Sequence, residues 1–187
     1  MCAHQNHYHE QVEIVDHIRR STSHLLQVVN DILDFSQLQA GRLQLHLADL
    51  DLAALLSETV ARHQERAREK GLFLQAHTDV PDALHVRADR QRLQQVLNNL
   101  LDNAIKYHQA PGRVTISFRD EADAVQVSFQ DTGPGIPPEE QDRIWERLYR
   151  GDKSRSQRGL GLGLSVVKAV VEALKAVPQI NVRVEGD

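Results

Sequence analysis

The longest helical pattern in the chain covers residues 11–40, where apolar residues recur every three or four positions. Gly41 follows directly and is typical of a helix end. The apolar positions form a broad stripe, which suits a helix bundle better than a single narrow seam. They are Ile18, Leu25, Val28, Ile32 and Phe35, widened by Leu26, Val29 and Leu33. A helix that docks on its own domain would carry a similar stripe, so both interpretations stay open.

After residue 41 the pattern alternates between strand-like and helix-like stretches. Asp51 and Asp89 are placed to cap two helices, and Gly71 to end the first of them. The expected helices run from Asp51 to Lys70, over 93–107 and over 164–174, and the expected strands are 43–47, 72–78, 84–86, 114–118, 125–129 and 180–184. Strands 114–118 and 125–129 are expected to form a hairpin. The fold class that follows is α+β: a two-layer α/β sandwich with helices on one face of a mixed sheet.

Composition limits the choice of function. The 187 residues are 41% apolar, enough for one core with an added helix, and the net charge of −4 gives no reason to expect nucleic acid as a partner. Cys2 is the only cysteine, which excludes an intrachain disulfide. Residues 1–10 include His4, His7 and His9 without a scaffold, and are interpreted as a disordered or non-native terminus.

No signal peptide and no run of about 18 apolar residues is present. We therefore expect a cytoplasmic location and no membrane contact by this piece. A longer, membrane-anchored parent protein is compatible with this expectation.

The helix predicted over 93–107 carries a polar stripe beside its apolar face. Asn99 and Asn103 are four residues apart and share this stripe, and Lys106 and Tyr107 follow one turn later. An Asn carbonyl is a hard oxygen ligand that suits Mg²⁺, Lys suits a phosphate, and Tyr offers a flat face to a purine. A solvated helix face would have the same composition, so the stripe alone does not distinguish a binding site from an ordinary exposed surface.

A strand-like stretch runs directly into Asp131-Thr-Gly-Pro-Gly-Ile136. A carboxylate at a strand end can accept a hydrogen bond from an exocyclic amine, and the glycines let the backbone approach a ring. An ordinary turn has a similar composition.

Three further glycines precede the helix that begins at Leu164: Gly159, Gly161 and Gly163. Backbone N–H groups at a helix start favour a phosphate, although this spacing is neither a Walker loop nor a dinucleotide fingerprint. A glycine-rich hinge is the simpler alternative. Together, and in this order, the three segments predict a pocket for a nucleotide and its metal.

These segments resemble the ATP-binding catalytic domain of bacterial sensor histidine kinases, in the superfamily shared with gyrase, Hsp90 and MutL. Residues 99–107 resemble the family's N box, 131–136 its G1 box, 144–153 its F box and 159–164 its G2 box, and the boxes follow the family's order. The resemblance covers roughly residues 18–172, and 18–41 is similar to the second helix of the dimerisation hairpin. It implies the Bergerat ATP-binding fold, with ATP and Mg²⁺ as cofactors.

The resemblance also implies roles for single residues. Asn103, with Asn99, would bind Mg²⁺, and Lys106 and Arg150 would contact phosphates. The residues expected around the base are Tyr107 along the adenine ring, Asp131 as acceptor from its amino group, and Gly133, Gly135 and Ile136 at its wall; those expected beside the triphosphate are Gly159, Gly161, Leu162, Gly163 and Leu164.

Several positions depart from the family pattern. The family's phosphoacceptor histidine precedes an acidic residue and a Thr/Ser-Pro pair, but His9 lacks such a proline, and His17 and His24 lie on what resembles the second hairpin helix. The phosphoacceptor is therefore not identifiable, and we do not expect autophosphorylation in cis. Trp145 and Leu148 replace two phenylalanines of the F box, and both are apolar, so we expect this lid to pack. After the G2 helix the chain has Ala173-Leu-Lys-Ala-Val-Pro178 in place of the family's His-Gly-Gly. We expect residues 180–184 to be its last strand, so that the family's usual final strand would be lacking and one sheet edge incomplete.

We therefore expect the Mg-ATP-binding catalytic domain of a sensor histidine kinase, over residues 42–187, attached to a dimerisation helix over 11–41. Its family chemistry is γ-phosphoryl transfer to a histidine and then to an aspartate of a response regulator receiver domain. The Ile18–Phe35 helix face would form a homodimer or bind a kinase partner.

Two alternatives stay open: a non-catalytic nucleotide-binding module that modulates a kinase, and an anti-sigma-type Ser/Thr kinase. A gyrase- or Hsp90-type ATPase fits less well, because the chain has no room for a transducer domain.

Overall fold

The computed structural model describes residues 44–78, 84–108, 110–121, 124–151 and 161–175, together with positions 11, 14, 15, 18, 19, 21, 22, 25, 26, 29, 32, 33 and 36. The chain divides into two compact units, residues 1–42 and 43–187. Each unit is described by itself.

In the first unit every described position is helical, in agreement with the helix predicted there. The described apolar residues of this helix are exposed within the chain, among them Ile18, Leu25 and Ile32. Val28 and Phe35 lie outside the described residues. Over the described part of the chain, the structure has no helix with the length and hydropathy needed to cross a membrane.

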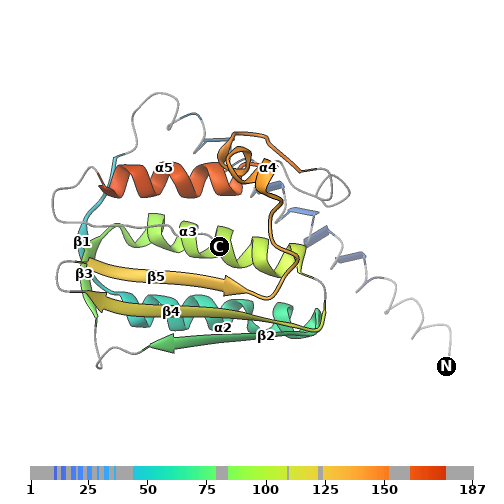
Figure 1. Cartoon of the computed structure of the whole chain (residues 1–187), viewed down its shortest axis with the longest axis horizontal. Coiled ribbons are helices and arrows are strands. Elements are labelled where there is room, and N and C mark those ends of the chain that lie inside the picture. Colours follow the sequence, from blue (N-terminus) through green and yellow to red (C-terminus); the bar gives the residue numbers. More distant parts are fainter. Residues whose placement is uncertain are drawn as a thin grey trace. The chain divides into compact units, whose positions relative to one another are not determined.

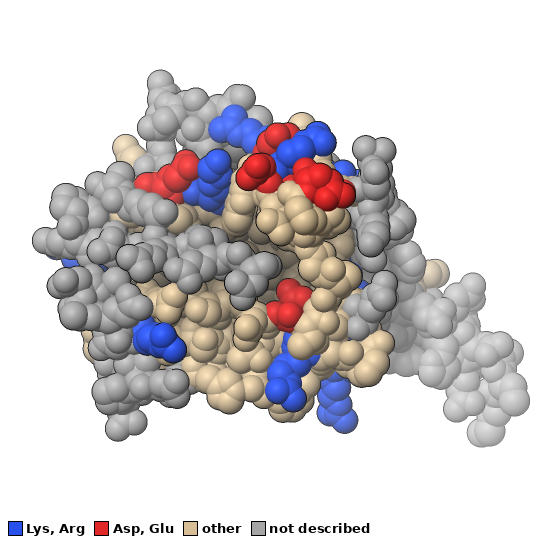
Figure 2. All heavy atoms as spheres, in the orientation of Figure 1, with Lys and Arg blue, Asp and Glu red and all other residues tan. Residues whose placement is uncertain are grey.

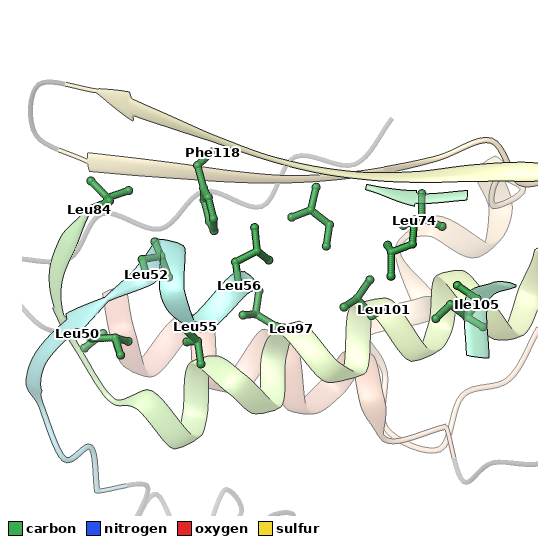
Figure 3. Close-up of a cluster of buried hydrophobic side chains, with 14 of the residues drawn as sticks. Leu50, Leu52, Leu55, Leu56, Leu74, Leu84, Leu97, Leu101, Ile105 and Phe118 are labelled. Atoms are coloured by element: carbon green, nitrogen blue, oxygen red, sulfur yellow. The ribbon is translucent and has the colours of Figure 1, made fainter. Parts of the chain in front are cut away.

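The second unit is a two-layer arrangement of helices and strands, shown in Figure 1. Its elements are β1 (Ala48–Asp51), α2 (Leu52–Glu69), β2 (Leu72–Thr78), β3 (His85–Ala88), α3 (Arg90–Tyr107), β4 (Gly112–Glu121), β5 (Ala124–Asp131), α4 (Pro138–Gln141), the 3₁₀ helix η1 (Arg143–Trp145) and α5 (Gly163–Lys175). Helices α2 and α3 lie on one face of the sheet that contains β4 and β5 (Figure 3), and α5 packs against α3. The predicted fold class is confirmed.

The larger sheet has the strand order β2-β4-β5 and is mixed, as predicted. Strand β2 runs parallel to β4, with Leu74 opposite Val114, whereas β4 and β5 are antiparallel, with Ile116 opposite Phe129. The predicted hairpin is therefore present, and its strands are longer than expected. Strands β1 and β3 form a separate antiparallel pair.

The predicted helix caps are confirmed. Asp51 accepts a hydrogen bond from Ala54 N at 3.0 Å, and Asp89 accepts one from Arg92 N at 3.0 Å. Both carboxylates satisfy N–H groups that the first turn of a helix leaves without a partner. Gly71 follows the end of α2 with φ of +69°, a conformation that glycine adopts at little cost.

Two strand predictions were wrong in their bounds. The alternation of Leu43, Leu45 and Leu47 predicted a strand over 43–47, but the described residues there, 44–47, are not in a strand, and β1 begins at Ala48. The strand predicted over 84–86 lies at His85–Ala88. The cause is pairing: β1 and β3 form one ladder, from Ala48 opposite Ala88 to Asp51 opposite His85, and this ladder sets both bounds. The strand predicted over 180–184 lies outside the described residues.

The core lies between the larger sheet and the helices. Figure 3 shows Phe118 pointing from β4 toward the helices, with Leu56 of α2 and Leu97 of α3 beneath it. The buried residues of this cluster are Leu50, Leu52, Leu55, Leu56, Ala67, Leu72, Leu74, Leu84, Ala88, Leu97, Leu101, Ile105, Val114, Ile116 and Phe118. Helix α3 thus uses one face for the core, which leaves its other side for a site.

Replacing Phe118, which is 1% exposed, by alanine should lower the free energy of unfolding by about 3–5 kcal/mol, because the change leaves a cavity in the core. Phe73 on β2 is a matched control because it is 58% exposed, so Phe73→Ala should change stability by less than about 0.5 kcal/mol. Urea unfolding followed by circular dichroism measures both. Equal effects of the two substitutions would contradict this placement of the core.

Candidate functional site

Helix α3 directs the two predicted metal ligands toward the start of α5. Asn99 Nδ2 donates a hydrogen bond to the carbonyl oxygen of Gly163 at 3.3 Å. A Cβ atom built on Gly163 would lie 3.8 Å from Asn99 Oδ1 and 3.9 Å from Asn103 Nδ2. The two asparagines and the first residue of α5 therefore meet at one place, although they are distant in the sequence.

The donors at this place suit a magnesium ion. Because Asn99 Nδ2 is engaged by the Gly163 carbonyl, Oδ1 is the amide atom that remains for a cation. Mg²⁺ takes few protein ligands and prefers oxygen atoms. No cluster of three or more His, Cys, Asp or Glu side chains that could hold a metal occurs among the described residues. The fit to Mg²⁺ therefore depends on amide oxygens together with a phosphate ligand.

Lys106 and Tyr107 form a pair in the last turn of α3. Lys106 Nζ lies 4.7 Å from the centroid of the Tyr107 ring and donates a hydrogen bond to its hydroxyl oxygen at 2.9 Å. The tyrosine is exposed, and the lysine is half-buried. A flat aromatic face and a cation are thus held together at the end of the helix that carries Asn103.

Asp131 is the last residue of β5 and leads into the glycine-containing turn. Its Oδ1 accepts a hydrogen bond from Gly133 N at 2.7 Å, which fixes the orientation of the carboxylate. Gly135 has φ of +66°, and a Cβ atom there would meet nothing within 4 Å. Ile136 is exposed, and its carbonyl accepts from Gln141 Nε2 at 3.2 Å. The turn therefore presents a carboxylate, open backbone and one apolar side chain.

The F box and the G2 box meet at Gly161. This glycine has φ of +72°, and a Cβ atom there would lie 2.6 Å from the carbonyl oxygen of Tyr149 and 3.1 Å from Arg150 Cγ. Leu148 N donates to the Gly161 carbonyl at 3.1 Å. Only glycine fits this conformation and this contact, so the segment before α5 is joined to residues 148–150.

The remaining predicted residues of the G2 box are placed as follows. Leu162 is buried, and its carbonyl accepts from Val166 N and from Ser165 Oγ, each at 2.9 Å. Leu164 is half-buried in the first turn of α5. Gly159 lies outside the described residues.

The lid predicted from the F box packs only in part. Trp145 is half-buried, but Leu148 is 62% exposed and has φ of +60°, so the expected packing of Leu148 was wrong. Its positive φ turns the backbone toward Gly161 instead. Figure 2 shows acidic and basic side chains together at the top of this face, around α4. In the 3₁₀ helix η1, which follows α4, Arg143 Nε lies 3.8 Å from Glu146 Oε2.

A charged group that the sequence did not reveal supports α3 from the side of α2. Asp102 lies between the two asparagines in the sequence but faces α2, where its Oδ1 is 2.6 Å from Arg66 Nη1 and 3.4 Å from His63 Nε2. His63 is buried, and its Nδ1 donates to the Thr59 carbonyl at 2.9 Å, since a carbonyl can only accept. These contacts hold α3 at one rotation relative to α2.

The same contacts affect the charge of Asp102. Burial alone would raise the pKa of this carboxyl group, but His63 and Arg66 outweigh it, so that the pKa of Asp102 lies below its ordinary value. The short distance between Asp102 Oδ1 and Arg66 Nη1 makes this contact a close ion pair. No local pattern predicts this pair, because its members lie on different helices.

A second contact missed by the sequence lies at the end of α3. His108 Nε2 is 3.1 Å from Thr132 Oγ1, in the turn that follows Asp131. In the sequence, this contact is indicated only by the places of its two residues. The histidine directly follows the predicted adenine-contacting tyrosine, and the threonine directly follows the predicted carboxylate.

The fold and this arrangement define a nucleotide-binding module of the two-layer α/β type, and comparisons with known proteins assign its family. The model of the histidine kinase-, DNA gyrase B- and HSP90-like ATPases matches residues 88–186, which is more than half of the chain. The chain belongs to this family. Within it, the similarity is to histidine kinases, as the resemblance of the four boxes predicted.

Three relatives show the extent of the similarity. The chain is 38% identical over 165 residues to the circadian input-output histidine kinase CikA of Synechococcus elongatus, covering 87% of this chain and 22% of CikA. The crystal structure of full-length ShkA in complex with AMPPNP has a TM-score of 0.75 at 35% identity, over 89% of this chain and 34% of ShkA. The histidine kinase ThkA in complex with the response regulator protein TrrA has a TM-score of 0.64 at 29% identity, over 83% of this chain and 42% of that chain. The chain thus spans less than half of each relative.

Replacing Asp102 by asparagine should lower the free energy of unfolding by roughly 1–3 kcal/mol at neutral pH, because it removes a partly buried charge from Arg66 and His63. The folded-state pKa of Asp102 is depressed, so its stabilisation is present above the ordinary carboxyl pKa and is lost as the pH falls through the folded-state value. The difference between the native protein and Asp102→Asn should therefore shrink as the pH falls below about 4. Urea unfolding at several pH values measures it, and a difference independent of pH would contradict the assignment.

Proposed function

We propose that this chain binds Mg-ATP between α3, the start of α5 and the Asp131–Ile136 turn. The observation that carries the proposal is the meeting of Asn99 and Asn103 with Gly163, because it joins a hard-oxygen donor set to a helix start. The complex of ShkA with AMPPNP, an ATP analogue, supports an adenine nucleotide as the ligand.

Each group has a defined task in this proposal. The amide oxygens of Asn103 and Asn99 hold Mg²⁺, and the ammonium group of Lys106 moves from the Tyr107 hydroxyl to the phosphates. Arg150, which lies in the F box, contacts the phosphates. When bound, Mg²⁺ neutralises charge on the phosphate oxygens, as is general for phosphoryl transfer. Backbone N–H groups at the start of α5 and before it, over the G2 box, donate to the triphosphate.

The other end of the site would hold the base. The Asp131 carboxylate accepts from the adenine amino group through Oδ2, because Oδ1 already accepts from Gly133 N. The ring of Tyr107 lies along the adenine, and Gly133, Gly135 and Ile136 form the wall of the pocket.

We further propose that the bound nucleotide donates its γ-phosphoryl group to a histidine of a kinase dimerisation hairpin, from which the group passes to an aspartate of a receiver domain. The attacking imidazole nitrogen forms a bond to phosphorus, and ADP leaves. The complex of ThkA with the response regulator TrrA supports the class of partner. The known relatives are kinases, which favours this proposal over a non-catalytic module or an anti-sigma-type kinase.

The exposed apolar face of the first unit would supply the pairing surface. Ile18, Leu25 and Ile32 are exposed at heptad spacing, as in a helix that packs against a second helix. We propose that this face, which in the sequence runs from Ile18 to Phe35, pairs with a second copy or with a kinase partner.

Asn103→Ala should weaken binding of a Mg²⁺-loaded, non-hydrolysable ATP analogue by about ten- to hundredfold, as expected when an interaction of about 1.5–3 kcal/mol is lost. Asn98→Ala is the matched control on the same helix. Asn98 Oδ1 is buried without a hydrogen-bond partner, so removing it breaks no hydrogen bond of this oxygen and should leave the affinity unchanged. Calorimetric titration with and without Mg²⁺ measures both variants. Unchanged affinity in Asn103→Ala would rule out the metal assignment.

The transfer step predicts phosphohistidine on a separate chain. The protein is mixed with radiolabelled ATP and a purified dimerisation hairpin that carries an acceptor histidine, and acid-labile phosphate is followed over time. Label should appear with the native protein and be absent with Asn103→Ala. If the nucleotide binds but no histidine is labelled by any hairpin with which the chain pairs, the kinase proposal fails while nucleotide binding stands.

A further inference from the structure

His108 connects the end of α3 to the turn that carries the base acceptor. The helix ends at Tyr107, and His108 adopts an extended conformation, with φ of −71° and ψ of 147°. Its Nε2 lies 3.1 Å from Thr132 Oγ1, and the side chain is half-buried. Thr132 directly follows Asp131, so the histidine contacts the neighbour of the proposed acceptor.

Thr132 is also fixed to the start of β4. Its hydroxyl oxygen accepts from Arg113 N at 3.0 Å, and its own N–H donates to the Arg113 carbonyl at 3.1 Å. With His108, three contacts converge on this one residue. The backbone around Asp131 is therefore held from two sides, by a strand and by the end of α3.

Gly112 leaves the space that the imidazole ring occupies, and Gly133 lies beside the ring. A Cβ atom on Gly112, the first residue of β4, would overlap the ring of His108. A Cβ atom on Gly133 would lie 3.7 Å from His108 Cδ2, at ordinary contact distance. The ring thus lies between the first residue of β4 and the turn, and Gly112 has no side chain to displace it.

We infer that His108 is a positioning residue that sets the selectivity of the site for a base with an exocyclic amino group. It acts through Thr132 on the orientation of the Asp131 carboxylate, whose Oδ1 is already fixed by Gly133 N. This inference rests on the nucleotide site proposed above and names the determinant of its base selectivity.

The ratio of the affinities for two different bases reports on Asp131 and is not changed by a loss of stability alone. Adenine carries an amino group that donates to a carboxylate, whereas hypoxanthine carries a carbonyl oxygen at the same position and cannot donate. A correctly oriented Asp131 therefore favours an adenine nucleotide over the inosine nucleotide. A displaced Asp131 loses this preference, although contacts to the phosphates are unchanged.

The test compares the binding of non-hydrolysable ATP and inosine triphosphate analogues by calorimetry. His108→Ala should lower the affinity for the adenine nucleotide about tenfold, as expected when the hydrogen bond between the adenine amino group and the charged Asp131 carboxylate is lost. The affinity for the inosine nucleotide should change less than about twofold. Thr132→Val, which removes the hydroxyl group that contacts both His108 and Arg113 N, should reduce the selectivity for the adenine nucleotide at least as much. His108→Gln should restore most of the selectivity, because its amide can reach the hydroxyl group.

Controls separate this role from a general loss of structure. His85 is exposed on β3, in the other sheet, and His85→Ala should leave both affinities unchanged. In an Asp131→Asn background, His108→Ala should cause no further loss of adenine selectivity, since the acceptor is already altered. Equal weakening of both nucleotides by His108→Ala would overturn the inference and leave the proposed function intact. A folded native protein that binds neither nucleotide would overturn both.

Discussion

The rotation of α3 about its own axis is the constraint on which the rest of the structure depends. One face of this helix, with Leu97, Leu101 and Ile105, closes the core beneath the sheet. The adjacent side, with Asn99 and Asn103, meets the first residue of α5. Because side chains on a helix are separated by fixed angles, a small rotation that repacks the core would also move both amides away from Gly163. The packing of the core therefore also sets the positions of the site residues on α3.

The contacts around α3 all restrain that rotation or its ends. At its first turn, the Asp89 carboxylate accepts from Arg92 N, and in its middle Asp102 is paired with Arg66 and His63 of α2. Directly after its last turn, His108 reaches the turn that begins at Asp131. Each contact is modest in energy, but they act on different parts of one helix and in different directions. The site is thereby built on a rigid element, and the segment around Leu148 is joined to Gly161, two residues before the first residue of α5.

The parts of the fold predicted from the sequence are those determined by local patterns. Asp51 and Asp89 cap their helices as predicted, because a cap involves residues only three positions apart. The strand predicted around Leu45 was wrong, because its bounds depend on pairing with β3, which the local alternation does not contain. The four boxes were recognised from the types and order of their residues, and the family that they indicated is confirmed, while the roles of the single residues stay predictions. The contacts Asp102–Arg66 and His108–Thr132 were not, because each joins elements that only the fold brings together.

The central claim is that the asparagines of α3 and the start of α5 form a Mg-ATP site. The most direct test is a calorimetric titration of the native chain with a non-hydrolysable ATP analogue, with and without Mg²⁺. The account predicts binding that is at least about tenfold tighter with the metal, because amide oxygens need a cation to contact the phosphates. Binding of equal strength without Mg²⁺ would contradict the role of Asn99 and Asn103, and no binding by a folded sample would contradict the site as a whole.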